Sequence, residues 1–191
     1  MRLILLMLCA VLIGGCVRSI NPVLEDAQVG EYPELAGKWV AADGSASNLE
    51  LIPDGKTFRV SPMDDEGKQG SFVLRIGKVG KLTVMECKPA DLPANLSHDY
   101  SAQLMPTYTF AVLTQTQPKV MARTLKPDWL DRYVAEHPQE LPMARVGGEA
   151  IIVASTKQLQ AFIEKHWETE EAWTNVVVYV RPETATTTNT R

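Results

Sequence analysis

Residues 70–89, GSFVLRIGKVGKLTVMECKP, hold two runs of alternating apolar and polar residues on either side of Gly80. Phe72, Leu74 and Ile76 recur at every second position, which is the period of a β-strand with one buried face. Gly80 stands where a tight reversal needs a backbone conformation that other residues rarely adopt. The stretch therefore predicts a β-hairpin.

The same pattern extends over much of the chain in both directions. Further runs of this kind, separated by turn residues such as Asp54-Gly55 and Pro118, are GKWVA, SNLELI, TFRVS, HDYSAQLM, YTFAVLTQ and KVMARTL. Short connections between sequential strands favour an antiparallel meander. A sheet with one apolar face must curl or be covered. We therefore expect a mainly β fold that forms a barrel or a strongly curled sheet, with Phe58, Phe72, Tyr108 and Phe110 as large candidates for its interior.

Two helices interrupt the β pattern late in the chain. The first, DWLDRYVAEH at 128–137, follows Pro127 and can use Asp128 as its N-cap. The second begins at Ser155-Thr156, where Gln158 completes a capping-box pattern. Between them, 143–155 reads as a hairpin that turns at two glycines. After them, NVVVYVR is a continuous apolar strand, either buried on both sides or closing the sheet.

One short motif adds to this fold prediction. Gly37-Lys38-Trp39 opens the first predicted strand, and this G-x-W resembles the start of the first strand in lipocalins and related calycin barrels. The resemblance implies a lipocalin-like barrel in which the Trp lies under one end and an Arg from the last strand packs across it. Arg181, at the end of the last predicted strand, is in the right position to be this arginine. The alternative is a core Trp on an edge strand, and in either case Trp39 is structural.

The N-terminus carries the most specific signal. Residues 1–16, MRLILLMLCAVLIGGC, combine one positive charge, an apolar run and small residues before Cys16, and they resemble the lipobox of bacterial lipoproteins. The resemblance implies a signal peptide over 1–15 and a diacylglyceryl thioether on Cys16. The apolar run is too short for a membrane-spanning helix, which needs about 20 residues. An ordinary signal peptide remains the alternative.

These signals divide the chain. We expect a lipidated tether over 16–34, because these residues show no sustained period, a single barrel domain over 35–182, and a disordered tail over 183–191. Together with the lipobox, the pattern over 35–181 resembles a group of uncharacterised bacterial lipoproteins. Val17 in place of Asp after the cysteine resembles proteins sent to the outer membrane, facing the periplasm, if the host has two membranes.

The net charge and the cysteine content limit the binding partners and the disulfides that can be expected. The formal net charge is −4 with no Lys/Arg run, which argues against a nucleic-acid partner and leaves the lipid as the attachment to the membrane. Cys9 leaves with the signal peptide and Cys16 is the predicted lipidation site, so no second cysteine remains to form an intramolecular disulfide with Cys87. Cys87 is predicted to be a small buried thiol.

Candidate chemistry is sparse. His166 and Glu170 have metal-ligand spacing, but a solvated helix face is the favoured interpretation; His98-Asp99 lies in a polar loop, and His137 ends a helix. Asp64-Asp65-Glu66-Gly67 is interpreted as a hairpin tip instead of a calcium loop. We expect no enzyme, metal or cofactor. The favoured function is a binding module for an apolar small molecule; the alternative is a structural or protein-interaction lipoprotein with a filled barrel.

Overall fold

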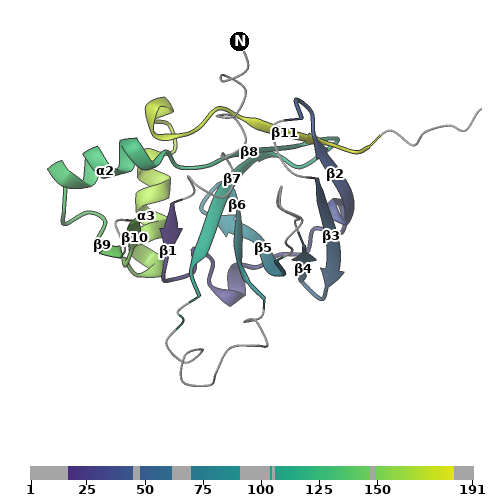
Figure 1. Ribbon diagram of the computed structural model, residues 1–191, viewed down its shortest axis with the longest axis horizontal. Coiled ribbons are helices and arrows are strands. Elements are labelled where there is room, and N and C mark those ends of the chain that lie inside the picture. Colours follow the sequence, from purple (N-terminus) through teal and green to yellow (C-terminus); the bar gives the residue numbers. More distant parts are fainter. Residues whose placement is uncertain are drawn as a thin grey trace, which may run out of the picture.

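A computed structural model describes residues 17–44, 48–61, 70–90, 104, 106–146 and 149–182. Eight of the described strands form a closed antiparallel barrel, which confirms the mainly β, lipocalin-like expectation (Figure 1). They are β2 (Gly37–Ala41), β3 (Leu49–Asp54), β4 (Thr57–Val60), β5 (Phe72–Val79), β6 (Leu82–Pro89), β7 (Tyr108–Gln115), β8 (Val120–Arg123) and β11 (Val177–Val180). Each strand pairs with the next, and β11 pairs with both β8 and β2 to complete the ring.

The two ends of the barrel are built differently. Tight turns at Gly55, Gly80 and Pro118 join β3 to β4, β5 to β6 and β7 to β8 at one end, here named the turn end. Gly55 and Gly80 have φ angles of +62° and +54°, in the left-handed region where glycine is favoured. At the opposite end, here named the loop end, β2, β4 and β6 end and β3, β5 and β7 begin.

The barrel encloses one of two hydrophobic cores. The interior core contains the buried residues Leu35, Trp39, Ala41, Leu51, Phe58, Val60, Leu74, Ile76, Ala111, Leu113, Val120, Ala122 and Tyr179. A second core lies outside the barrel and includes Val84, Phe110 and Val112. Strands β6 and β7 therefore bury side chains on both of their faces.

This double burial corrects the expected orientation of β7. Ala111 and Leu113 belong to the interior core, so Phe110 and Val112 face outward, and Tyr108 shares their face. Phe58 is in the interior core as predicted, and Phe72 lies on the inward face with Leu74. The prediction of interior positions for Tyr108 and Phe110 is wrong because their apolar face is covered from outside.

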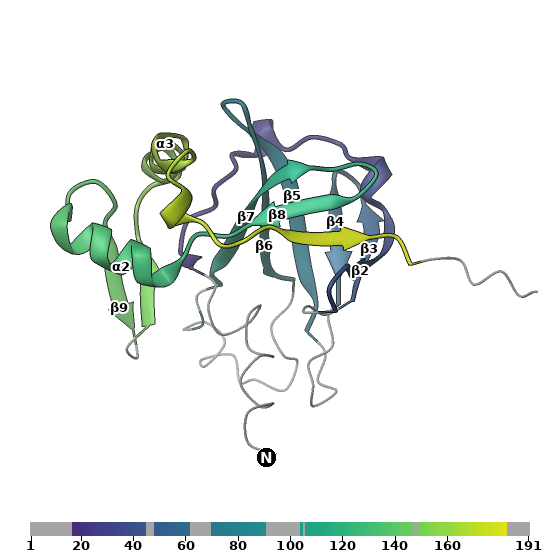
Figure 2. The same cartoon turned by 90° about the horizontal axis from the view of Figure 1, so that it is seen from above.

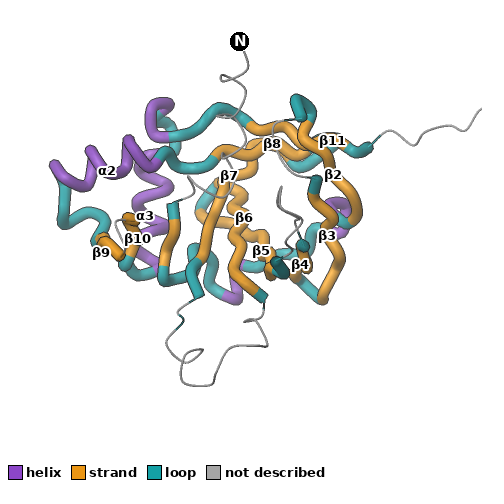
Figure 3. The backbone as a smooth tube through the Cα atoms, in the orientation of Figure 1, coloured by secondary structure: helices purple, strands orange, loops and turns teal. Residues whose placement is uncertain are grey.

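The outer cover comes from an insertion between β8 and β11. It contains α2 (Pro127–Glu136), the antiparallel hairpin of β9 (Met143–Val146) and β10 (Glu149–Ile152), and α3 (Thr156–His166), followed by the short η3 (Glu170–Ala172). Both views place α2, α3 and the hairpin on one side of the barrel (Figures 2 and 3). The capping box between Ser155 and Gln158 is present. The N-cap of α2 is Lys126 and not Asp128, because Pro127 occupies the first helical position, where no N–H is needed.

Residues 17–34 are not a tether. Within them, β1 (Arg18–Ser19) pairs antiparallel with β7 and parallel with β10, and η1 (Asp26–Gln28) and η2 (Pro33–Leu35) follow. Val23 and Leu24 are completely buried in the outer core. The folded unit therefore includes residues 17–34 and does not begin at residue 35. The predicted signal peptide over 1–15, Cys16 and the tail over 183–191 lie outside the described residues.

Candidate functional site

Trp39 and Arg181 cap the turn end of the barrel. The guanidinium carbon of Arg181 lies 3.9 Å from the centroid of the Trp39 ring, so the predicted stacking is present. The Arg181 Nη2 donates to the carbonyl oxygen of Glu34 at 2.7 Å, and the indole Nε1 of Trp39 donates to that of Leu35 at 2.8 Å. These bonds hold η2 across the base of the barrel.

The structure explains why a glycine occupies the first position of the G-x-W motif. Gly37 has a φ of +99°, and a Cβ at this position would lie 2.9 Å from the Arg181 Nη1. The same nitrogen donates to the carbonyl oxygen of Lys38 at 3.3 Å. A side chain at residue 37 would therefore meet both backbone strain and the stacked arginine.

Solvent exposure inside the barrel rises toward the loop end on four of its eight strands, whereas on β2, β4 and β8 the inward residue nearest that end, Ala41, Val60 or Ala122, is buried. On four strands, the inward-facing residue nearest the loop end is half-buried and the next one toward the turn end is buried. These pairs are Leu49 and Leu51 on β3, Phe72 and Leu74 on β5, Thr109 and Ala111 on β7, and Val177 and Tyr179 on β11. Met85 and Cys87 on β6 face inward opposite Ile76 and Leu74 and are also half-buried. The interior surface at the loop end is thus largely apolar and partly accessible.

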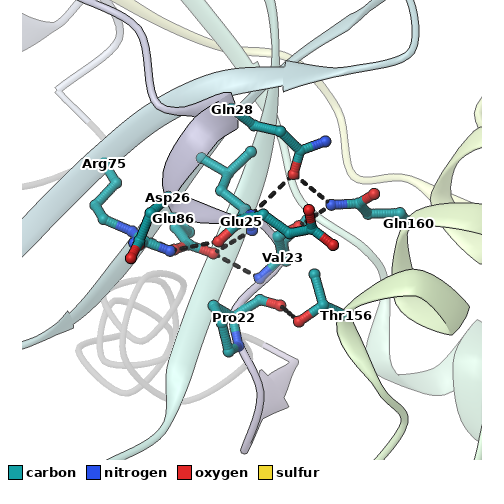
Figure 4. A network of polar contacts seen from close by, with 10 residues as sticks. Pro22, Val23, Glu25, Asp26, Gln28, Arg75, Glu86, Thr156 and Gln160 are labelled. Atoms are coloured by element: carbon teal, nitrogen blue, oxygen red, sulfur yellow. Dashed lines mark hydrogen bonds and ion pairs between the residues drawn. The ribbon is translucent and has the colours of Figure 1, made fainter.

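A buried carboxylate fastens the N-terminal segment to the outside of the barrel (Figure 4). The Glu86 side chain is 1% exposed, and its Oε2 accepts hydrogen bonds from the backbone N–H groups of Val23 at 2.6 Å and Leu24 at 3.0 Å. Its Oε1 accepts from Arg75 Nε at 2.7 Å. Arg75 also donates to Asp26 at 2.6 Å and to the carbonyl oxygen of Leu24 at 2.5 Å. We name these five residues the Glu86 network.

Helix α3 holds the same segment from the other side (Figure 4). The Gln160 side-chain amide donates to the carbonyl oxygen of Val23 at 2.6 Å and to the side-chain oxygen of Gln28 at 2.7 Å. The Thr156 hydroxyl donates to the carbonyl oxygen of Pro22 at 2.8 Å. The segment is therefore clamped between a barrel strand and a helix.

This network was not predicted from the sequence, although one signal for it exists. Arg75 and Glu86 face each other in the register of the hairpin that turns at Gly80, so counting outward from that turn brings the two charges together. Nothing in the local pattern indicates that a third segment covers the pair and removes it from water. That cover is what makes Glu86 buried.

His166 is also buried, contrary to the prediction of a solvated helix face. It is 7% exposed, and its ring centroid lies 4.5 Å from that of Tyr133, 4.6 Å from that of Phe162 and 5.3 Å from that of Trp129. Its Nε2 has no hydrogen-bond partner and lies 4.0 Å from a carboxylate oxygen of Glu140. The reason is that α2 packs its aromatic stripe over the end of α3.

Burial favours the neutral form of His166. Burial lowers the pKa of the His166 imidazole, and the positive charge of Lys165 lowers it further, whereas Glu140 raises it. The Glu140 carboxylate is already engaged, because it accepts from Lys165 Nζ at 2.6 Å and from the Tyr133 hydroxyl at 2.8 Å. His137 stacks on Tyr133 at 4.4 Å between ring centroids.

The other residues that were considered as possible metal ligands or reactive groups do not form a site in the described part of the chain. Glu170 pairs with Arg123 at 2.8 Å and not with His166, and the described residues contain no group of three metal-ligating side chains. His137 contacts the carbonyl oxygen of Tyr133 with its Nδ1 at 3.1 Å, at the end of α2 as predicted. Cys87 is half-buried on the inward face of β6, so it is more exposed than predicted. His98-Asp99 and Asp64-Asp65-Glu66-Gly67 lie outside the described residues.

The chain was compared with protein-family models, with curated proteins and with solved structures. No match was found. Within the described part of the chain, no helix is long and apolar enough to cross a membrane. The candidate site therefore rests on the geometry of the barrel itself.

Proposed function

We propose that this protein is a lipid-anchored lipoprotein of the cell envelope whose barrel binds an apolar small molecule through its loop end. The observation that carries the binding proposal is the gradient of exposure inside the barrel. Half-buried apolar side chains such as Leu49, Phe72 and Val177 face inward at the loop end, whereas the inward residues behind them are buried. Apolar surface that is accessible from one end is what an apolar ligand would cover.

The lining sets the chemistry of the ligand. Covering exposed apolar surface contributes roughly 25 cal/mol per Å². An eight-stranded barrel is just wide enough to hold one small ligand. Trp39, Phe58 and Tyr179 already fill the interior toward the turn end, so the ligand would occupy the half of the barrel next to the loop end. Among the described residues, Cys87 and Thr109 are polar groups that it would meet there.

The envelope location is proposed on the lipobox that ends at Cys16. In a bacterium with two membranes, Val17 after that cysteine favours the outer membrane, with the domain facing the periplasm. Two or three acyl chains are sufficient for stable attachment, because each buried methylene contributes about 0.8 kcal/mol.

A charge placed inside the barrel tests the binding proposal. The mature chain with Cys16→Ser, which is not lipidated, is titrated with the fluorescent apolar probe N-phenyl-1-naphthylamine. Leu49→Glu puts a carboxylate on the inward face of β3, and we expect at least tenfold weaker probe binding because that charge would be desolvated. Ile52→Glu is the matched control, since Ile52 is 52% exposed on the same strand.

The control variant should bind the probe like the parent protein, and thermal melts of all three proteins show whether they are folded. If the parent does not bind the probe, or if Leu49→Glu binds it as tightly as Ile52→Glu does, the interior is not the binding site. The alternative of a filled structural barrel would then replace the proposal.

A further inference from the structure

Strand β7 is the place where the barrel wall divides. Its residues from Val112 to Gln115 pair with β8, whereas Tyr108 and Thr109, at the loop end, pair with β1 on the same edge. Strand β1 pairs in turn with β10, so the hairpin of β9 and β10 extends the sheet beyond the barrel (Figure 1). One face of this extension therefore continues the inner face of the barrel.

Arg18 lies on that continuing face. Residues opposite each other in paired strands have their side chains on the same side of a sheet. Arg18 lies opposite Thr109, which faces the barrel interior. The two neighbours of Arg18 point the other way, because Val17 belongs to the outer core and Ser19 is completely buried. Cys87, Thr109 and Arg18 therefore form a row on one face across β6, β7 and β1.

The row leads from uncharged side chains to a positive charge at the edge of the interior. At the loop end, the inward-facing side chains of the described strands include Leu49, Phe72, Met85, Cys87, Thr109 and Val177, all of which are uncharged. Opposite residues in paired strands have Cβ atoms about 4.5–5.5 Å apart, so the long side chain of Arg18 starts one strand away from Thr109. A molecule whose apolar part covers the loop-end interior would meet the Arg18 guanidinium at the edge of that interior.

The guanidinium group of Arg18 is accessible to a further anion. Its ion pair with Glu149 joins Nη2 to Oε2 at 3.3 Å, and the two side chains are 42% and 65% exposed. Ion pairs between exposed side chains contribute little to stability. A guanidinium group presents several N–H donors in one plane, in a geometry that matches a carboxylate. Because Glu149 supplies one negative charge nearby, a singly charged carboxylate fits this place better than a doubly charged phosphate.

We propose that the ligand of the barrel is a long-chain carboxylic acid, whose hydrocarbon chain covers the loop-end interior and whose carboxylate accepts hydrogen bonds from Arg18. This inference rests on the proposed ligand binding and adds the chemistry of the head group. An ionised carboxylate inside the uncharged interior would lose its hydration without gaining a partner, which is costly. The head group therefore stays at the edge of the barrel, beside Arg18 and Thr109, and only the chain enters.

Displacement of a neutral probe measures the contribution of the carboxylate. The mature chain with Cys16→Ser is loaded with N-phenyl-1-naphthylamine, and dodecanoate, dodecanol and dodecyl phosphate compete with the probe below the concentrations at which they form micelles. These competitors share one chain and differ in the head group. Arg18→Gln removes the positive charge and keeps a polar side chain on β1. Arg59→Gln is the matched control, because Arg59 also pairs with an exposed carboxylate, that of Asp54, but faces outward between two interior residues of β4.

In Arg18→Gln, half-displacement of the probe should need roughly five times more dodecanoate than in the parent, because charge-assisted hydrogen bonds are lost, whereas the dodecanol values should agree within about twofold. Arg59→Gln should behave like the parent. Glu149→Gln removes a competing carboxylate and should leave dodecanoate at least as effective as in the parent. Unchanged dodecanoate displacement in Arg18→Gln, an equal loss in Arg59→Gln, or a loss in Glu149→Gln would overturn the assignment of Arg18. Stronger displacement by dodecyl phosphate than by dodecanoate would overturn the carboxylate as the head group.

Binding of the probe itself separates this failure from failure of the proposed function. The three variants leave the interior of the barrel unchanged, so each should bind N-phenyl-1-naphthylamine like the parent, which also shows that it is folded. Glu149→Gln tests the same contact without a change in Arg18. If the parent binds the probe but Arg18→Gln does not alter displacement by dodecanoate, only the head-group assignment is wrong. If the parent does not bind the probe, the proposed ligand binding fails and the head-group assignment fails with it.

Discussion

The guanidinium group of Arg181, which directly follows the last barrel strand, stacks on the ring of Trp39 in the first, with 3.9 Å between the guanidinium carbon and the ring centroid. The same arginine donates to the carbonyl oxygens of Lys38 and Glu34. Strands β2 and β11 complete the ring by pairing with each other. The arginine therefore links these two strands to η2 at the turn end of the barrel.

This contact predicts non-additive mutations. Trp39→Ala should cost about 3–5 kcal/mol of unfolding free energy, as a large core truncation. Arg181→Ala should cost less, about 0.5–2 kcal/mol for the stacking. Because contacting residues couple, the double variant should lose less than the sum of the two single losses. Urea unfolding of the four proteins measures the coupling, and additive losses would show that the stacking contributes nothing in solution.

The Glu86 network predicts a large effect from a single carboxylate. Glu86→Ala leaves Arg75, whose side chain is only 16% exposed, without its buried partner, and it removes the acceptor of two backbone N–H groups. Breaking a buried ion pair from one side costs about 3–5 kcal/mol. Denaturant unfolding measures this loss.

Asp26→Ala is the matched control, because Asp26 pairs with the same arginine but is 97% exposed. Exposed ion pairs contribute little, so this variant should unfold almost like the parent. Similar losses from the two variants would mean that the burial of Glu86 is not what stabilises the network.

The N-terminal segment should be required for stability. Leu24 is completely buried, and Leu24→Ala is expected to cost about 2–5 kcal/mol, whereas Val146→Ala, at a residue that is 61% exposed, should have little effect. A chain that starts at Glu31 should melt at a much lower temperature than one that starts at Val17. Equal melting temperatures for the two chains would restore the tether interpretation.

Stability should fall as His166 becomes protonated. Burial lowers its pKa, so the unfolded chain takes up this proton first when the pH falls below about 6.5. The stability gained from the neutral, buried ring is complete above that value and is lost as the pH falls through the lower pKa of the folded state.

Melting temperatures between pH 7.5 and pH 5 measure this dependence. His166→Phe keeps a ring against Tyr133 and Phe162 and should flatten the pH dependence in that range. If His166→Phe keeps the full pH dependence, another group titrates in this window.

Lipidation is predicted from the Ile13-Gly14-Gly15-Cys16 pattern. In cells supplied with a labelled fatty acid, the parent chain should take up label and Cys16→Ser should take up none. Cys87→Ser is the control and should be labelled like the parent. Label on the Cys16→Ser protein would rule out the lipobox interpretation.

Local patterns were sufficient for the hairpin and helix signals of this fold, but not for the elements within 17–34. The alternation around Gly80 predicts the β5–β6 hairpin, and Ser155 with Gln158 predicts the start of α3, because each signal depends only on residues within a few positions. The G-x-W resemblance led to the stacking of Arg181 on Trp39, which joins residues far apart in the sequence. Of the candidate site, the sequence predicted an apolar interior but not its gradient of exposure.

Only the tertiary structure decided how the elements are covered. A period of two says that Phe110 and Ala111 face opposite ways, but which one faces inward depends on α3 and the N-terminal segment covering the outside. The same cover buries Glu86, which a strand pattern alone would leave in water. Residues 17–34 have no period because they are fixed by individual bonds to distant strands and to α3, and such contacts leave no local trace in a sequence.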